Sequence, residues 1–180
     1  MMSNFSLTLD PVDHITVDAI GKPGNRVFYI QGTKGDEKIT LIIEKIQLQS
    51  LIAASEQFFT EISQSYDGIS KPDPDITESE MEIHPPVDPK FRVGEIGLAY
   101  DNARDLVCII TKEWAALDSE QAERGTVNYW CTRKQLAALI KWGVIVVERG
   151  RPICPQCLQP MEPEGHFCPK KNGHKKAKKL

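Results

Sequence analysis

The chain has 180 residues, of which 41% are hydrophobic and 26% charged, a composition that favours a globular protein and excludes a wholly disordered one. The formal net charge of −3 conceals an asymmetry, because residues 170–180 hold six lysines and no acid. Without those six positive charges the rest of the chain carries −9. We expect no signal peptide, since no basic stretch precedes an apolar run near residue 1, and no membrane-spanning segment of about 18 apolar residues.

The cysteine pattern differs from that of a secreted disulfide framework. There are five cysteines, an odd number, and three of them cluster near the C-terminus. Cys108 and Cys131 stand alone in apolar runs, where a buried and inert thiol is the expected state. We therefore expect a cytoplasmic protein whose clustered thiols stay reduced.

The first half of the chain reads as three strands followed by a helix. Residues 14–20, 27–32 and 39–45 are strand-like, with turns at "GKPGNR" and "TKGDEK". The hydrophobic period then changes, and residues 47–63 are predicted to form an amphipathic helix. Its buried face should hold Leu48, Leu51, Ile52, Ser55, Phe59 and Ile62.

Residues 64–90 differ in composition from both flanks. They contain five prolines and seven acidic residues, too little apolar surface to offset the entropy of ordering them. We interpret this stretch as a linker or a long acidic surface loop between the halves 10–63 and 91–150.

The second half repeats the order of the first. Strand patterns at 91–100, 105–114 and 126–132 precede a helix that begins at Arg133, after the capping-box pattern Thr132-x-x-Gln135. The expected buried positions of this helix are Leu136, Leu139, Ile140, Val144 and Val147. We predict an α+β domain over 1–150, with an antiparallel sheet and two helices that suggest two ββ-β-α repeats.

The C-terminal segment has the spacing of a metal site. Cys154-x-x-Cys157 is a tight pair of thiols, and Cys168 follows eleven residues later. His166 or His174 could supply the fourth ligand of a tetrahedral Zn²⁺ site. For His166 and Cys168 to converge, the backbone must turn sharply, and Gly165 permits that turn.

Three other interpretations of this segment are possible: free cysteines in a disordered tail, a redox CxxC pair, and a catalytic zinc site. A disordered tail is disfavoured because a Cys and a His accompany the CxxC within 21 residues. A redox pair is disfavoured because prolines place the CxxC in a loop. No general base stands out, which opposes the third. We predict a small zinc-ribbon-like segment at 151–174 with structural zinc, followed by a basic tail at 175–180.

Three sequence blocks, "GKPGNRVFYIQ", "FRVGEIGLAYD" and "ERGRPICPQCLQPMEPEGHFCPKKNG", resemble those of an uncharacterised bacterial family, the domain-of-unknown-function family thirty-ninety. The resemblance covers about residues 10–173. It implies a bacterial cytoplasmic protein without an established activity, and an associative link to phosphate metabolism. The family block G-H-x-C-P implies Cys154, Cys157, His166 and Cys168 as the ligands, with His174 as the alternative fourth ligand.

The sequence supports a binding or adaptor module more than an enzyme, because no motif supplies a nucleophile or a general base. We expect a protein partner and no membrane. One alternative is a nucleic-acid-binding protein that uses the sheet or zinc ribbon with the lysine tail. A second is an enzyme with an active site between the repeats. "GKPGNR" is expected to be a plain turn, although Arg26 in a phosphate-binding loop is the competing interpretation.

Overall fold

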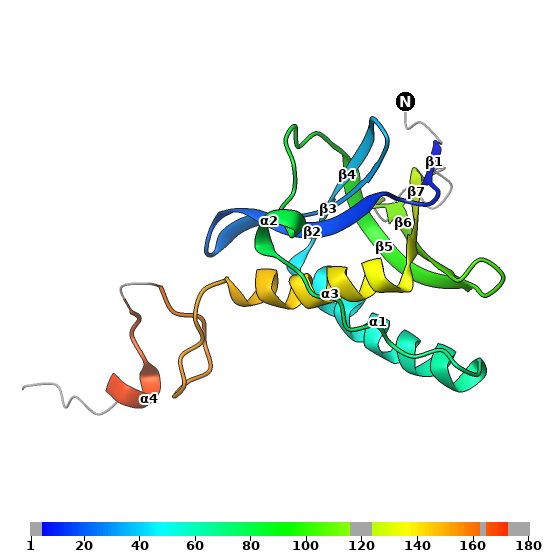
Figure 1. Cartoon of the computed structure of the whole chain (residues 1–180). Helices are drawn as coiled ribbons and strands as arrows, with labels where there is room; N and C mark the ends of the chain where they lie inside the picture. The colour runs from blue at the N-terminus through cyan, green and yellow to red at the C-terminus, as the bar shows by residue number, and fades with distance from the viewer. Residues whose placement is uncertain (1–4, 116–123, 163–164, 173–180) are drawn as a thin grey trace, which may run out of the picture.

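The computed structural model describes residues 5–115, 124–162 and 165–172 (Figure 1). Three strands and a helix come twice in the chain, as the sequence predicts, with additional short elements around them. None of the helices in the described ranges is both long and apolar enough to cross a membrane. The strands are β1 Ser6–Leu9, β2 His14–Lys22, β3 Asn25–Lys34, β4 Glu37–Ile43, β5 Pro89–Asp101, β6 Leu106–Glu113 and β7 Thr126–Thr132. The helices are α1 Lys45–Ser65, α2 Glu78–Met81, α3 Arg133–Glu148 and α4 Pro169–Asn172.

The seven strands form one mixed sheet in the order β1-β7-β6-β5-β4-β3-β2. Within each half the three strands pair antiparallel. The prediction of a purely antiparallel sheet is wrong at two joins, because β4 pairs parallel with β5 and β1 pairs parallel with β7. The first parallel join follows from the connection: α1 carries the chain back, so that β5 starts in the same direction as β4.

The sheet curls until β3 and β7 approach one another. The turn between β1 and β2 bridges them, since Val12 N–H donates to Trp130 O on β7 and Asp13 N–H donates to Thr33 O on β3, both at 2.8 Å. Gly32 on β3 faces the Tyr129 ring closely enough that a methyl group there would lie 2.5 Å from Cδ1. The curled sheet thereby encloses most of the core.

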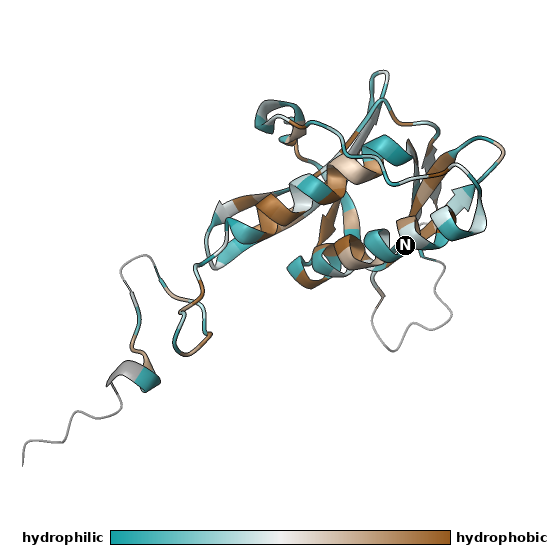
Figure 2. Ribbon diagram, turned by 60° about the horizontal axis from the view of Figure 1, so that its bottom comes forward, coloured by the Kyte–Doolittle hydropathy of each residue, from teal (hydrophilic) through white to brown (hydrophobic). Residues whose placement is uncertain are grey.

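Helices α1 and α3 cover the core, and hydrophobic and hydrophilic residues alternate along both (Figure 2). The predicted capping box of α3 is confirmed, with Thr132 N–H donating to Gln135 Oε1 at 2.8 Å and Gln135 N–H to Thr132 Oγ1 at 3.1 Å. Val144 was expected to be buried but is 40% exposed. Gly143 occupies the contact instead, where α3 meets Leu48 and Ile52 of α1. The predicted face of α1 is buried, with Ile52 half-buried.

The acidic segment between the halves lies along the body. Met81 of α2 is buried, and its carbonyl accepts a hydrogen bond from Thr16 Oγ1. The buried Gln31 amide holds His84 twice, donating to its carbonyl at 3.1 Å and accepting from its N–H at 3.0 Å. Lys141 of α3 pairs with Asp73 at 2.9 Å. Asp73 of this segment thus meets a cation of α3, and Glu78 pairs with Arg149, the residue after α3, at 2.9 Å.

Candidate metal centre

The first loop of the C-terminal segment is a tight knuckle around Cys154 and Cys157. Cys154 N–H donates to Gln159 O, and Leu158 N–H donates back to Cys154 O, both at 2.9 Å. Leu158 adopts a left-handed conformation, with φ +60°. This reversal closes the turn and places both thiols on the same side of the loop.

The second loop brings His166 and Cys168 toward the first. Gly165 N–H donates to Glu162 O at 2.9 Å, and Gly165 has φ +102°, a conformation that glycine adopts at little cost. The sharp turn that the sequence required before His166 is therefore present. Helix α4 begins immediately after Cys168.

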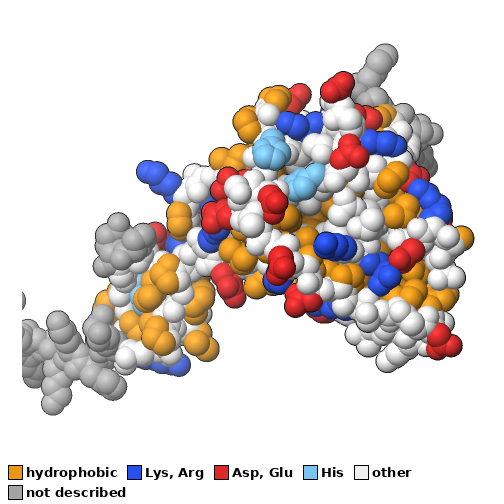
Figure 3. All heavy atoms as spheres, in the orientation of Figure 1, with side chains coloured by type: hydrophobic (Ala, Val, Ile, Leu, Met, Phe, Trp, Pro, Cys, Tyr) orange, Lys and Arg blue, Asp and Glu red, His pale blue; other side chains and the backbone are white. Residues whose placement is uncertain are grey.

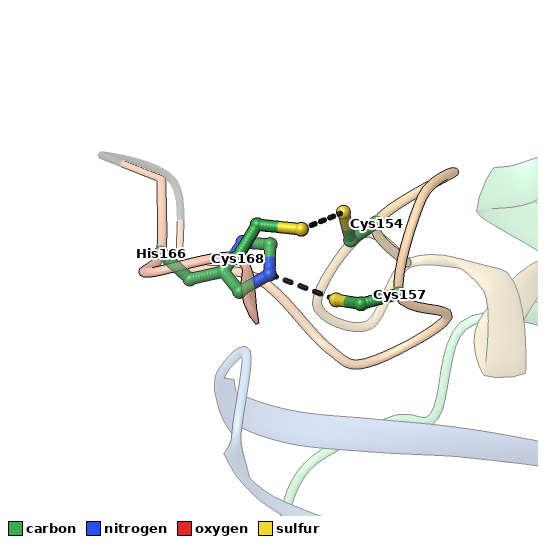
Figure 4. A group of neighbouring side chains, drawn as sticks. All are labelled: Cys154, Cys157, His166 and Cys168. Atoms are coloured by element: carbon green, nitrogen blue, oxygen red, sulfur yellow. Dashed lines mark hydrogen bonds between the residues drawn. The ribbon is translucent and has the colours of Figure 1, made fainter. Parts of the chain in front are cut away.

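The four side chains point toward one centre (Figure 4). Cys157 Sγ lies 3.1 Å from His166 Nε2, and Cys154 Sγ lies 3.9 Å from Cys168 Sγ. All four ligand atoms are within 4.8 Å of one another. A tetrahedral ion with bonds of about 2.3 Å to sulfur requires sulfur atoms about 3.8 Å apart, so these residues could hold a metal ion.

The local backbone favours a thiolate at this centre. The N–H groups of Cys157 and Gln156 point at the Cys154 sulfur and lower its pKa from 9.0 to about 7. A metal binds the thiolate rather than the thiol, so a lowered pKa reduces the cost of losing the proton. Cys154 and Cys168 are buried, which shields the centre from water.

The segment contacts the body near its first residues. Arg151 pairs with Glu162 at 2.7 Å, and its guanidinium lies against Gly24 in the turn between β2 and β3. Hydrophobic side chains gather on the outer surface of the segment (Figure 3). They include Ile153, Leu158 and Phe167, which are 54%, 71% and 72% exposed.

The structure places the other sequence candidates as follows. His174 and the lysine tail at 175–180 lie outside the described residues. Cys108 and Cys131 are buried, as predicted, and burial raises the pKa of each thiol, to about 11 and about 12. His14 and His84, distant in sequence, have ring centroids only 6.3 Å apart.

A second feature has no motif in the sequence: a groove of 410 Å³ between α1 and β5. Strand β4 ends at Ile43, whereas β5 continues to Asp101, so β5 extends beyond the end of β4. In the described part of the chain, no strand pairs with that side of β5 beyond Arg92. Gln47 Nε2 donates to the carbonyls of Val93 and Gly94 at 3.0 and 3.3 Å, and closes only the first part of this edge.

Beyond Gly94, every second residue of β5 directs its backbone N–H and C=O groups toward the groove. Glu113 N–H donates to the carbonyl of Gly125, the residue before β7, whereas Trp114 N–H donates to Arg92 O on β5. In an antiparallel ladder the backbone N–H and C=O groups of successive residues point to opposite sides of the strand. In this register the N–H and C=O of Gly97 point toward β6, and those of Ile96 and Leu98 point to the open side of β5. The groove is therefore bounded by a free strand edge and a helix.

Comparison with curated proteins and with solved structures finds no match. A family described as "Protein of unknown function (DUF3090)" matches residues 7–168, a span that includes both halves and all four residues of the Cys/His cluster. The chain belongs to this family.

Proposed function

We propose that the protein is a binding module whose C-terminal segment is folded by a structural zinc ion, and that its groove binds an extended peptide from a partner protein. The observation that carries the proposal is the free edge of β5 beside α1. An extended peptide can add to such an edge as a further strand, with backbone hydrogen bonds for affinity and side-chain pockets for specificity.

The zinc assignment rests on the ligand chemistry. Three thiols and one imidazole suit Zn²⁺, and four protein ligands would fill a tetrahedron. A site without an open position has no place for a substrate or an activated water, so the role is structural. When bound, the ion would hold the two loops of the segment together, with Cys154, Cys157, His166 and Cys168 as its ligands.

The groove has the chemistry of a peptide site. Ile96 and Leu98 from β5 and Phe58 from α1 supply half-buried apolar surface. Glu61 is the acid among the lining residues, and no described cation forms a salt bridge with it. The occupant that fits is an antiparallel peptide with apolar residues at alternate positions and a basic residue that lies beside Glu61.

The alternatives named from the sequence have less support. Nine of the sixteen lysine and arginine side chains between residues 5 and 162 form ion pairs with acids, which reduces the positive charge that the body offers to a nucleic-acid backbone. The proposed active site between the halves gains no cluster of catalytic groups from the described residues. Five free thiols fit a reducing, cytoplasmic setting.

A display library of unstructured peptides tests the groove. A selected peptide is labelled, and its affinity is measured by fluorescence anisotropy for two matched variants of α1. Ala54 lines the groove, whereas Ala53 is exposed beside it and does not. Ala54→Trp should reduce affinity by at least about tenfold by filling the groove, and Ala53→Trp should leave it unchanged.

Hydrogen exchange distinguishes strand addition from simple apolar contact. Addition of a strand to β5 should slow exchange of the Ile96 and Leu98 amides, which have no ladder partner among the described strands. A peptide that binds equally well to Ala54→Trp, or that leaves these two amides unprotected, would refute the proposed mode. Loss of zinc without loss of peptide affinity would separate the two parts of the proposal.

A further inference from the structure

A second cavity of 240 Å³ lies where the C-terminal segment meets the body. Its walls come from the turn between β2 and β3, the start of α1, the end of α3 and the first residues of the segment. Two sequence blocks that are far apart, "GKPGNR" and "ERGRPICP", therefore meet at one place. The cavity is separate from the Cys/His cluster and from the peptide groove.

The lining of this cavity is positively charged. Arg26, Lys45 and Arg151 line it, and no acidic residue does. Lys45 takes part in no ion pair with a described residue, and Arg151 is paired only with Glu162. Arg26 donates to the carbonyl of Val146 at 2.8 Å, which fixes its guanidinium without neutralising its charge.

Two glycines let these cations converge. A methyl group at Gly150 would lie 2.9 Å from Arg26 Nη2 and 3.4 Å from Lys45 Nζ, so both nitrogens approach the same point. Gly24, with φ +88°, lies against the Arg151 guanidinium, where a methyl group would be 3.0 Å from Nε. A side chain at Gly150 would occupy the space between Arg26 and Lys45, and one at Gly24 would press against Arg151.

The three cations outnumber the one described acid, Glu162, that forms an ion pair with any of them, so they repel one another and a bound anion would relieve that repulsion. Burial lowers the pKa of Arg26, and the nearby Asp18 acts in the opposite direction. Two guanidinium groups supply flat, paired N–H donors, and the lysine adds a compact charge. This combination suits an oxyanion that carries two negative charges better than a single carboxylate.

We propose that this cavity binds the phosphate group of a small phosphorylated molecule. Its volume lies just below the range of pockets for drug-sized ligands, roughly 300–1,000 Å³, and so fits a phosphate with a small organic group. Ile153 at the rim supplies apolar surface for that group. The proposal is independent of peptide binding in the groove.

Titration of the ¹⁵N-labelled, zinc-loaded chain with inorganic phosphate and with phenyl phosphate tests the site, at constant ionic strength. The amides of Gly24, Gly150 and Arg151 should shift saturably. Lys45→Gln should weaken binding by at least about tenfold, whereas Lys134→Gln, which removes an exposed charge on α3, should not. Tighter binding of phenyl phosphate would identify an organic phosphate as the ligand, and equal binding would identify phosphate itself.

The proposal fails if neither compound shifts these amides, or if Lys134→Gln weakens binding as much as Lys45→Gln. It also fails if a single-stranded oligonucleotide competes in a Lys45-dependent manner while both small compounds do not bind. In that case the cations would recognise a nucleic-acid backbone. The peptide affinity of Lys45→Gln is measured in parallel. This measurement distinguishes a failure of anion binding at the cavity from a failure of peptide binding in the groove.

Discussion

Cys157 Sγ and His166 Nε2 lie 3.1 Å apart although they belong to two different loops, and no strand or long helix joins those loops. This contact and the 3.9 Å approach of Cys154 Sγ to Cys168 Sγ bring together the two loops of a segment with few buried side chains. Such a segment depends on its metal for order, because ligand bonds replace the missing core.

Removal of the metal should therefore loosen residues 152–168 and leave the body folded. His166→Ala should lower zinc affinity by more than about 100-fold, since it removes a direct ligand. His174→Ala is the matched control and should keep one zinc per chain. Metal content and hydrogen exchange before and after chelation provide the measurements. Melting of α1 and α3 together with the metal would contradict the modular organisation.

Leu158 offers a way to strengthen the first knuckle. Its left-handed conformation costs a non-glycine residue about 1 kcal/mol, and its side chain is 71% exposed, so little packing is lost on truncation. Leu158→Gly should tighten zinc binding by about fivefold, measured by competition with a chelator. Leu158→Val should weaken it, because a β-branched residue tolerates this conformation less well. Equal affinities for the two variants would show that the backbone is not strained.

The closure of the sheet can be tested at two glycines in strands. Gly32→Ala would place a methyl group 2.5 Å from Cδ1 of the fully buried Tyr129 ring, and should destabilise the protein by about 1–3 kcal/mol. Gly97→Ala meets no atom within 4 Å and should be neutral or slightly stabilising. Urea denaturation of both variants measures the difference. A tolerated Gly32→Ala would mean that β3 and β7 are less closely packed than described.

Local patterns in the sequence were enough to predict strands β2 to β7 and the two long helices, but not β1, α2 or α4. Alternation gave β2 to β7, and helical spacing with the Thr132–Gln135 box gave α3, because these signals depend on residues near in sequence. The two parallel joins were missed, since they depend on where a connection returns the chain. Strand β1 pairs with β7 across more than a hundred intervening residues, and no local pattern records that contact.

The same distinction separates the two sites. The cluster around Cys154 and Cys157 could be anticipated because ligand spacing is a local property. The groove could not, because it exists only where β4 ends before β5 does, a difference between strands that are remote in sequence. The adjacency of His14 and His84 likewise arises from the way the acidic segment returns to β2 and β3.

His14 should make the stability of the protein depend on pH. Its side chain is half-buried, and its Nε2 has no hydrogen-bond partner among the described residues. Burial is the main cause that lowers the pKa of His14 below 6.5, and the nearby His84 acts in the same direction. The folded protein therefore binds a proton at this site less readily than the unfolded chain does.

The direction of the effect follows from that difference. Above about pH 7.5 both states are neutral at His14, so the residue adds no pH dependence. As the pH falls below 6.5 the unfolded chain gains the proton first, and the free energy of unfolding decreases until the lowered pKa of the folded state is passed. His14→Gln should remove this loss, so that the stability of wild type relative to the variant falls between pH 7.5 and pH 5.

Urea denaturation at a series of pH values measures that difference. Comparison of the two proteins at each pH cancels the contribution of the metal site, which also depends on protons. His84→Gln is the control: its side chain is exposed, and the variant should retain most of the acid-dependent loss because His14 stays half-buried. If wild type and His14→Gln lose stability in parallel down to pH 5, His14 is not the group whose burial opposes protonation.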